Sequence, residues 1–131
     1  MKTIITEGGT DAGLNSGRSY KERYIVRLND LIIPLQISNI AYVFSEDKNN
    51  YLVTFDRQKY IINSSLEIMA QELDPKYFFR ISRSCIVAME AIDSITKLNG
   101  GRLKISAHPK PAFEMTVSRS RVDDFLVWIE R

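Results

Sequence analysis

The chain has few of the residues on which metal and nucleophilic chemistry depends, because its 131 residues include one cysteine and one histidine. Cys85 has no partner for an intramolecular disulfide, which favours a reducing compartment. It also lies in an apolar run, so we expect a buried and inert thiol. His108 lies in an Ala-His-Pro-Lys-Pro segment that is typical of a solvated loop. Together the two residues argue against a zinc site.

Other signatures are absent too. The sequence has no phosphate-binding loop and no dinucleotide fingerprint, and no group of side chains that indicates an enzyme. We therefore expect a non-enzymatic protein without a cofactor or metal. No apolar run is long enough to cross a bilayer, and the first 19 residues lack the apolar core of a signal peptide. These absences favour a cytoplasmic protein.

The composition is that of a soluble globular protein, with 44% hydrophobic and 26% charged residues. The length suits one domain with a real core. The net charge of +2 is small, but the excess of Lys and Arg over Asp and Glu lies after Lys76. This distribution hints at an anionic ligand on the C-terminal side.

The chain divides into a tail and a domain. Residues 1–20 contain Gly8, Gly9, Gly13 and Gly17 among Thr, Asp, Asn and Ser, a composition typical of a flexible linker or tail. From residue 21 the pattern changes to one with a complete set of apolar positions. We therefore predict a single domain over residues 21–131.

Short apolar segments separated by turn residues predict a mainly β domain. The connections are too short for crossovers, which favours antiparallel pairing. We expect an edge hairpin around Asn29-Asp30 and a strong turn at Asn99-Gly100-Gly101. The expected strands are 24–28, 31–35, 37–44, 50–55, 59–62, 91–98, 102–107 and 112–117.

Two helices are predicted. Asn63 or Ser64 is the expected N-cap of a short middle helix that ends at Leu73, before Pro75. Ser118 is the expected cap of a C-terminal helix, whose buried face is predicted from helical spacing. That face consists of Val122, Phe125, Leu126 and Ile129. The expected fold class is therefore stacked antiparallel β-sheets with a short middle helix and a C-terminal helix.

The segment Tyr77–Val87, YFFRISRSCIV, is the most informative in the chain. Apolar residues flank Arg80, Ser82, Arg83 and Ser84, an arrangement that holds cations rigidly at a surface. Guanidinium groups held in this way suit bidentate contacts to phosphate or to the O6/N7 edge of guanine. The alternative is an edge strand whose arginines are merely solvated.

Three blocks in order give the chain a resemblance to LytTR-type DNA-binding domains, over roughly Tyr24 to Ile129. ISNIAYVFSEDKNNYLV from Ile37 resembles the family hairpin I-x-x-I-x-Y-I-E-A-x-x-x-Y-x-x, and YFFRISRSCIV resembles F-F-R-I-H-R-S-Y-I-V-N. NGGRLKI followed by Val117-Ser118-Arg119 resembles N-G-R-L-x-L with a later V-S-R. Ser82, Ala88 and Phe44 stand where the family usually has His, Asn and Glu, which affects the preferred base sequence more than the fold.

The resemblance implies contact with double-stranded DNA through loops, without a helix-turn-helix. By this resemblance, three parts of the chain are expected to contact DNA: the hairpin tip Lys48-Asn49-Asn50, the Arg83-Ser84 pair and Arg119. Candidate base contacts are Asn50, Arg83 and Arg119. Candidate backbone contacts are Lys48, Asn49, Arg80, Ser82, Ser84, Ser118 and Arg121. Arg80 is equally suited to a scaffold role, and the start of the last helix favours phosphate.

Two functions follow. The first is a bacterial transcription regulator, the effector part of a two-component response regulator, which binds promoter direct repeats. The resemblance implies an upstream receiver domain or a histidine-kinase signalling partner. No membrane partner is expected, and the nearly neutral domain is expected to be a monomer. The second is a β-rich protein-interaction module that does not bind DNA. An RNA-binding role is weaker, because no aromatic-rich, base-stacking strand is apparent.

Overall fold

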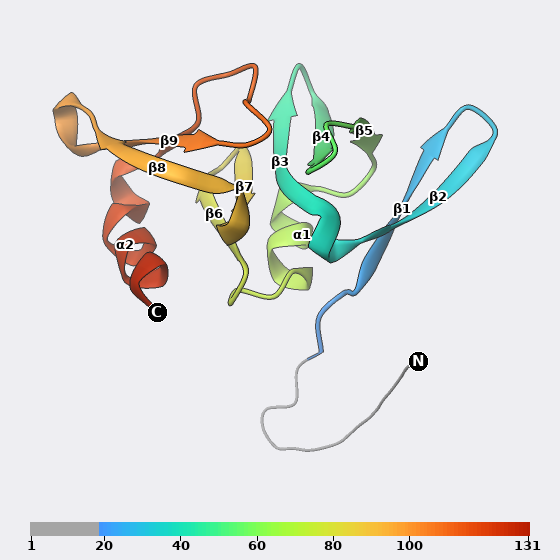
Figure 1. Cartoon of the computed structure of the whole chain (residues 1–131), viewed down its shortest axis with the longest axis horizontal. Helices are drawn as coiled ribbons and strands as arrows, with labels where there is room; N and C mark the ends of the chain where they lie inside the picture. Colours follow the sequence, from blue (N-terminus) through green and yellow to red (C-terminus); the bar gives the residue numbers. More distant parts are fainter. Residues whose placement is uncertain (1–18) are drawn as a thin grey trace.

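The computed structural model describes residues 19–131. The predicted linker over residues 1–20 lies almost entirely outside this range. The described part forms three antiparallel sheets (Figure 1), as the sequence predicts, with a two-stranded, a five-stranded and a three-stranded sheet. The strands are β1 (Arg23–Leu28), β2 (Leu31–Gln36), β3 (Ile40–Glu46), β4 (Asn49–Thr54), β5 (Lys59–Ile62), β6 (Phe78–Ser82), β7 (Cys85–Ala88), β8 (Ile92–Lys97), β9 (Leu103–Ala107) and β10 (Thr116–Val117).

The five-stranded sheet, in the order β5-β4-β3-β7-β6, forms the centre of the domain. Residues Ile40 to Phe44 of β3 are all buried, so both faces of this central strand are covered. Such a strand reads as a continuous apolar run of β-branched and aromatic residues rather than an alternating one. The expected strand start at Ile37 is wrong, because Ile37–Asn39 form a 3₁₀ turn before β3.

One face of this sheet is covered by α1 (Leu66–Glu72), which buries Leu66 and Met69. Its N-cap is Ser65, so the prediction of Asn63 or Ser64 is wrong. The Ser65 hydroxyl accepts a hydrogen bond from the Ile68 amide at 3.1 Å, whereas the Ser64 carbonyl accepts one from the Asn50 side chain. The helix ends before Pro75, which has no N–H to continue it.

The other face meets the three-stranded sheet and the loop that follows β9. In the expected strand 112–117, only Thr116–Val117 pair with β9. Pro109 and Pro111 precede this segment and lack the N–H groups that a ladder requires, so the chain leaves the sheet after β9. The loop packs across the central sheet instead: the Phe113 ring lies 4.7 Å from that of Phe44, and the Tyr42 hydroxyl donates to the Pro109 carbonyl at 2.9 Å.

The C-terminal helix α2 (Val122–Glu130) packs against β6 through Phe125 and Trp128. The prediction that Leu126 lies on the buried face is wrong, because Leu126 is 44% exposed and Trp128 is 5% exposed. The Trp128 indole donates to the Pro75 carbonyl at 2.7 Å. Ser118 is not a side-chain cap, because a 3₁₀ turn over Arg119–Arg121 precedes the helix.

The single cysteine and histidine occupy the environments expected from the sequence. Cys85 is 3% exposed, and burial raises the pKa of its thiol to about 12. His108 is exposed, and its Nδ1 lies 2.6 Å from an Asp93 carboxylate oxygen. Within residues 19–131, no helix is long and apolar enough to span a membrane. The same part of the chain has no cluster of metal-ligating side chains.

Candidate nucleic-acid interface

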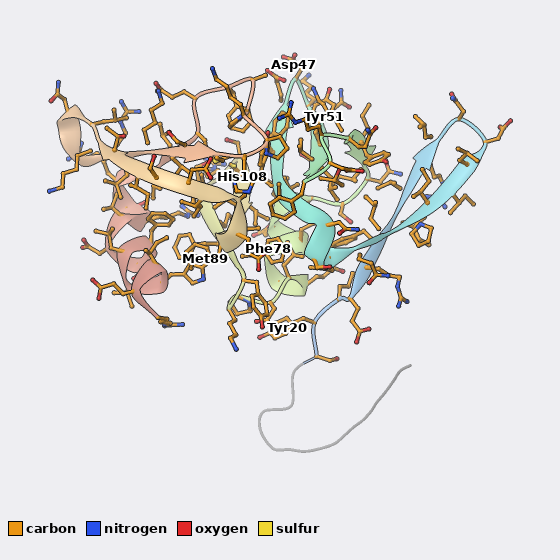
Figure 2. The ribbon with its side chains drawn as sticks, viewed as in Figure 1. Tyr20, Asp47, Tyr51, Phe78, Met89 and His108 are labelled. Carbon is orange, nitrogen blue, oxygen red and sulfur yellow. The ribbon has the colours of Figure 1, made fainter. Side chains whose placement is uncertain are left out.

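Two of the predicted DNA-contacting segments are turns at the same end of the five-stranded sheet. Asp47-Lys48 connects β3 to β4, and Arg83-Ser84 connects β6 to β7. The turns lie together because β3 pairs with both β4 and β7 in antiparallel register. The Ser45 amide donates to the Ser84 carbonyl at 2.9 Å, which joins the two turns directly. Figure 2 shows Asp47 at this end of the molecule.

Arg119 is brought to the same region by backbone bonding. The amide of Ser118 donates to the Ile81 carbonyl at 2.9 Å, and its hydroxyl reaches the same oxygen at 3.4 Å. Since Ile81 lies near the end of β6, Arg119 follows just beside the Arg83-Ser84 turn. The Arg119 side chain also lies along Gly101, where a Cβ would come 3.9 Å from its Nε. Gly101 has a φ of +81°, a backbone conformation that favours glycine.

Arg83 and Ser84 are exposed at the tip of their turn. Arg80 lies beneath them, partly buried, and its Nη2 donates to the Arg83 carbonyl at 2.8 Å. The hydroxyl of Ser82 accepts from the Ser84 amide at 3.3 Å. These bonds fix the backbone of the turn and leave the Arg83 guanidinium without an ion-pair partner in residues 19–131. Arg80 therefore has a positioning role toward Arg83.

The β3–β4 hairpin presents fewer free groups than the sequence suggests. Lys48 and Asn49 are exposed, and Asp47 and Lys48 both have positive φ angles, 52° and 67°, as two-residue type I′ hairpins require. Asn50 is partly buried. Its amide donates to the Ser64 carbonyl at 2.7 Å, and its side-chain oxygen accepts from the Ser45 hydroxyl. Asn50 thus ties the hairpin to the segment that precedes α1.

We expect Asn50→Ala to lower the free energy of unfolding by about 1–2 kcal/mol, because both bonds are lost and their partners stay partly buried. Urea unfolding followed by circular dichroism measures this change. Asn49→Ala is the control, since Asn49 is exposed and should have little effect on stability. Unchanged stability together with a loss of base preference would instead identify Asn50 as a base contact.

The structure adds one cation that the sequence analysis did not select. Arg102 is exposed and directly follows Gly101, along which the Arg119 side chain lies. The sequence could have indicated this residue, because Arg102 directly follows the strong turn Asn99-Gly100-Gly101. The first turn of α2, by contrast, carries Asp123 and Asp124. These carboxylates offset the helix dipole and disfavour an anion there, whereas the preceding 3₁₀ turn carries the cations Arg119 and Arg121.

The Tyr51 side chain packs on the sheet rather than standing free. Its ring stacks on that of Phe44 with centroids 5.2 Å apart and an interplanar angle of 27°. Lys59 Nζ lies 4.4 Å from the centroid of the Tyr51 ring. These contacts hold the ring against the five-stranded sheet.

Comparisons with known proteins identify the family and the fold. The model of the LytTr DNA-binding domain family matches residues 30–130. An uncharacterized response regulatory protein of Vibrio cholerae serotype O1 is 32% identical over 95 residues, which cover 66% of this chain and 36% of that protein. The chain therefore spans about a third of the length of this relative.

A solved structure has the same fold. It is the LytTr DNA-binding domain of a Bacillus cereus protein described as a methyl-accepting/DNA response regulator. It superposes with a TM-score of 0.75 at 22% sequence identity. The match covers 85% of this chain and 99% of that one.

Proposed function

The chain belongs to the LytTr DNA-binding domain family, and from this premise we propose that residues 21–131 are the output domain of a bacterial response regulator. In this proposal the domain binds promoter DNA that contains direct repeats, and it acts in the cytoplasm. The relative named as a response regulatory protein supports the assignment. It is long enough to contain a further domain, such as the proposed upstream receiver domain.

The observation that carries the proposal is the convergence of two turns and the Ser118–Arg121 segment at one end of the molecule. Arg83 and Arg119 have the donors for guanine in the major groove, and Arg80 fixes the turn that carries Arg83. The surrounding groups are suited to the phosphate backbone, whose contacts position the protein without reading sequence. They are Lys48, Asn49, Ser82, Ser84, Ser118 and Arg121.

Lys48→Ala should weaken binding to all duplexes about equally, because a phosphate contact carries no base information. The slope of log K against log salt concentration should become shallower by about one unit. Fluorescence anisotropy at several salt concentrations measures both effects. Lys76→Ala is the matched control, since Lys76 is exposed near the opposite end of the sheet. An unchanged slope would place the β3–β4 turn away from the DNA backbone.

A protein-interaction module is the second candidate function. Its support is the projecting β1–β2 hairpin, where Ile25, Leu31 and Ile32 are each more than half exposed. Exposed apolar patches are typical of protein contacts.

Selection of bound duplexes from a random DNA pool separates the two candidates. A DNA-binding domain should enrich a repeated motif and lose affinity steeply with salt. Failure to enrich any motif, with only weak and sequence-independent binding, would contradict the proposed function.

A further inference from the structure

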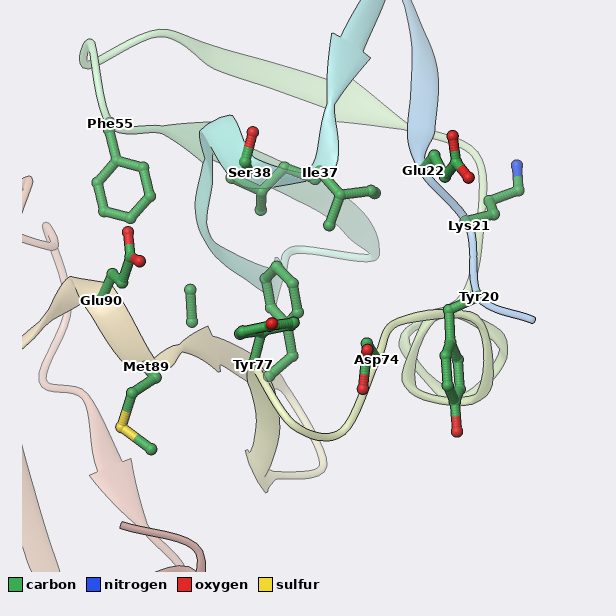
Figure 3. Close-up of a pocket in the computed structure, with 13 residues that line it drawn as sticks. Tyr20, Lys21, Glu22, Ile37, Ser38, Phe55, Asp74, Tyr77, Met89 and Glu90 are labelled. Atoms are coloured by element: carbon green, nitrogen blue, oxygen red, sulfur yellow. The ribbon is translucent and has the colours of Figure 1, made fainter. Parts of the chain in front are cut away.

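The domain has a cavity of about 440 Å³ at the end opposite to the DNA-facing turns. Ligand pockets in proteins typically measure roughly 300–1,000 Å³ and are mostly apolar. This cavity is lined mostly by apolar groups from five connections: the segment before β1, the β2–β3 turn, the β4–β5 turn, the α1–β6 loop and the turn after β7 (Figure 3).

Strand direction separates this cavity from the proposed DNA contacts. Ile40 begins β3 and Ala88 ends β7, whereas the two turns lie at the other ends of these strands. With about 3.3 Å per residue, the seven-residue β3 alone spans roughly 20 Å. Figure 2 shows the same separation, with Tyr20, Phe78 and Met89 at one end and Asp47 at the other. A ligand in the cavity would therefore not compete with a duplex.

The floor of the cavity is apolar and its rim is acidic. Ile40, Phe78 and Ala88 are buried in the floor, and the Tyr77 ring is 52% exposed at the opening. In Figure 3 this ring lies between Glu90 and Met89 on the left and Asp74 on the right.

Within residues 19–131, the rim carboxylates have no ion-pair partner. Glu22, Asp74 and Glu90 lie around the cavity, and none has a cation within 4 Å among the described residues. Lys21 is the one cation among the described lining residues, and its Nζ is directed elsewhere, 4.6 Å from the centroid of the Tyr24 ring. The lining therefore combines apolar surface for a hydrocarbon body with unpaired negative charge for a cation.

We propose that this cavity binds a small molecule with an apolar body and a protonated amine. On one side of the cavity, backbone hydrogen bonds fix the segment that precedes β1. The Lys21 amide donates to the Glu72 carbonyl at 2.9 Å, and the Ile37 amide donates to the Glu22 carbonyl at 3.0 Å. A bound ligand thus contacts the segment through which the preceding part of the chain enters the domain.

Two probes of nearly equal shape and opposite charge test the proposal: 4-phenylbutylamine and 4-phenylbutyrate. Each is titrated into the full chain and followed by amide chemical shifts. The amine should bind at least about fivefold more tightly than the carboxylate, with shifts concentrated at Phe55, Tyr77 and Met89. Equal binding of the two probes, no binding, or shifts centred elsewhere would overturn the proposal.

Substitutions of the rim carboxylates test whether their negative charge causes the preference for the amine over the carboxylate. The double variant Glu22→Gln/Glu90→Gln should lower the ratio of the two affinities clearly, because it neutralises two of the three rim carboxylates and leaves only Asp74. Both side chains are exposed, so the substitutions should leave the fold intact. Glu67→Gln is the matched control, since Glu67 is exposed on α1 outside the cavity. Retention of the full ratio in the double variant would contradict the proposal. DNA affinity, measured in parallel, should not change in any of these variants, so this test is independent of the proposed function.

Discussion

Replacing Arg83 with alanine is expected to abolish the preference for a specific duplex over a scrambled one while the domain stays folded. Arg83 is exposed at the tip of a turn whose backbone is fixed from below by Arg80. A rigidly presented guanidinium loses little conformational freedom when it forms two bonds to guanine. Its loss should cost about 1–3 kcal/mol of discrimination. Competition binding with specific and scrambled duplexes measures this difference.

Two further variants separate base reading from charge. Arg83→Lys keeps the positive charge but lacks the planar fork, so it should retain non-specific affinity and lose most of the discrimination. Arg27→Ala, in an exposed position of β1, should keep the specificity of the original chain. If Arg83→Ala binds both duplexes in the original ratio, Arg83 does not read a base.

Replacing Trp128 with alanine is expected to lower the free energy of unfolding by about 3–5 kcal/mol, the range for large aromatic truncations in cores. The Trp128 ring packs 5.3 Å from Phe79 and 5.9 Å from Phe125. The variant also leaves the Pro75 carbonyl without its indole donor. Because typical domains are stable by only about 5–15 kcal/mol, this variant should be close to unfolding.

Leu126→Ala is the matched control for Trp128→Ala. Leu126 lies two residues away on the same helix but is 44% exposed, so its truncation should change stability by less than about 1 kcal/mol. Urea unfolding must be followed by far-ultraviolet circular dichroism, because Trp128 is the only tryptophan of the chain. Equal effects of the two substitutions would mean that α2 packs in a different rotation.

The sequence predicts the strands of this fold well because their signals are local. Asn29-Asp30 and the Asn99-Gly100-Gly101 turn mark hairpins through the backbone angles that they favour. The errors arise where tertiary contacts decide. Leu126 and Trp128 both suit an apolar helix face, and only the position of β6 selects Trp128. The loop after β9 has strand-like residues, but Phe113 packs on Phe44 and only Thr116–Val117 pair with β9.

In the candidate site too, local features can be predicted from the sequence and tertiary contacts cannot. The sequence selects Arg83 and Arg119 through the motifs that surround them, and the structure places both at one end of the domain. The sequence does not reveal that the Asn50 side chain forms hydrogen bonds with Ser64 and Ser45, since Ser64 is 14 positions distant in the chain. Nor does it reveal that Arg80 faces the Arg83 carbonyl. Whether these residues contact DNA remains a prediction.

The burial of Cys85 has a practical consequence for spectroscopy. With a thiol pKa of about 12, almost none of this residue is thiolate near neutral pH, and the side chain is 3% exposed. Thiol-reactive dyes need the thiolate and access to it, so the folded domain should resist labelling at its only native cysteine. A cysteine introduced at an exposed position such as Asn49 would then carry the fluorophore alone. The distance between the hairpin tip and a labelled duplex becomes measurable by energy transfer without removing the native thiol.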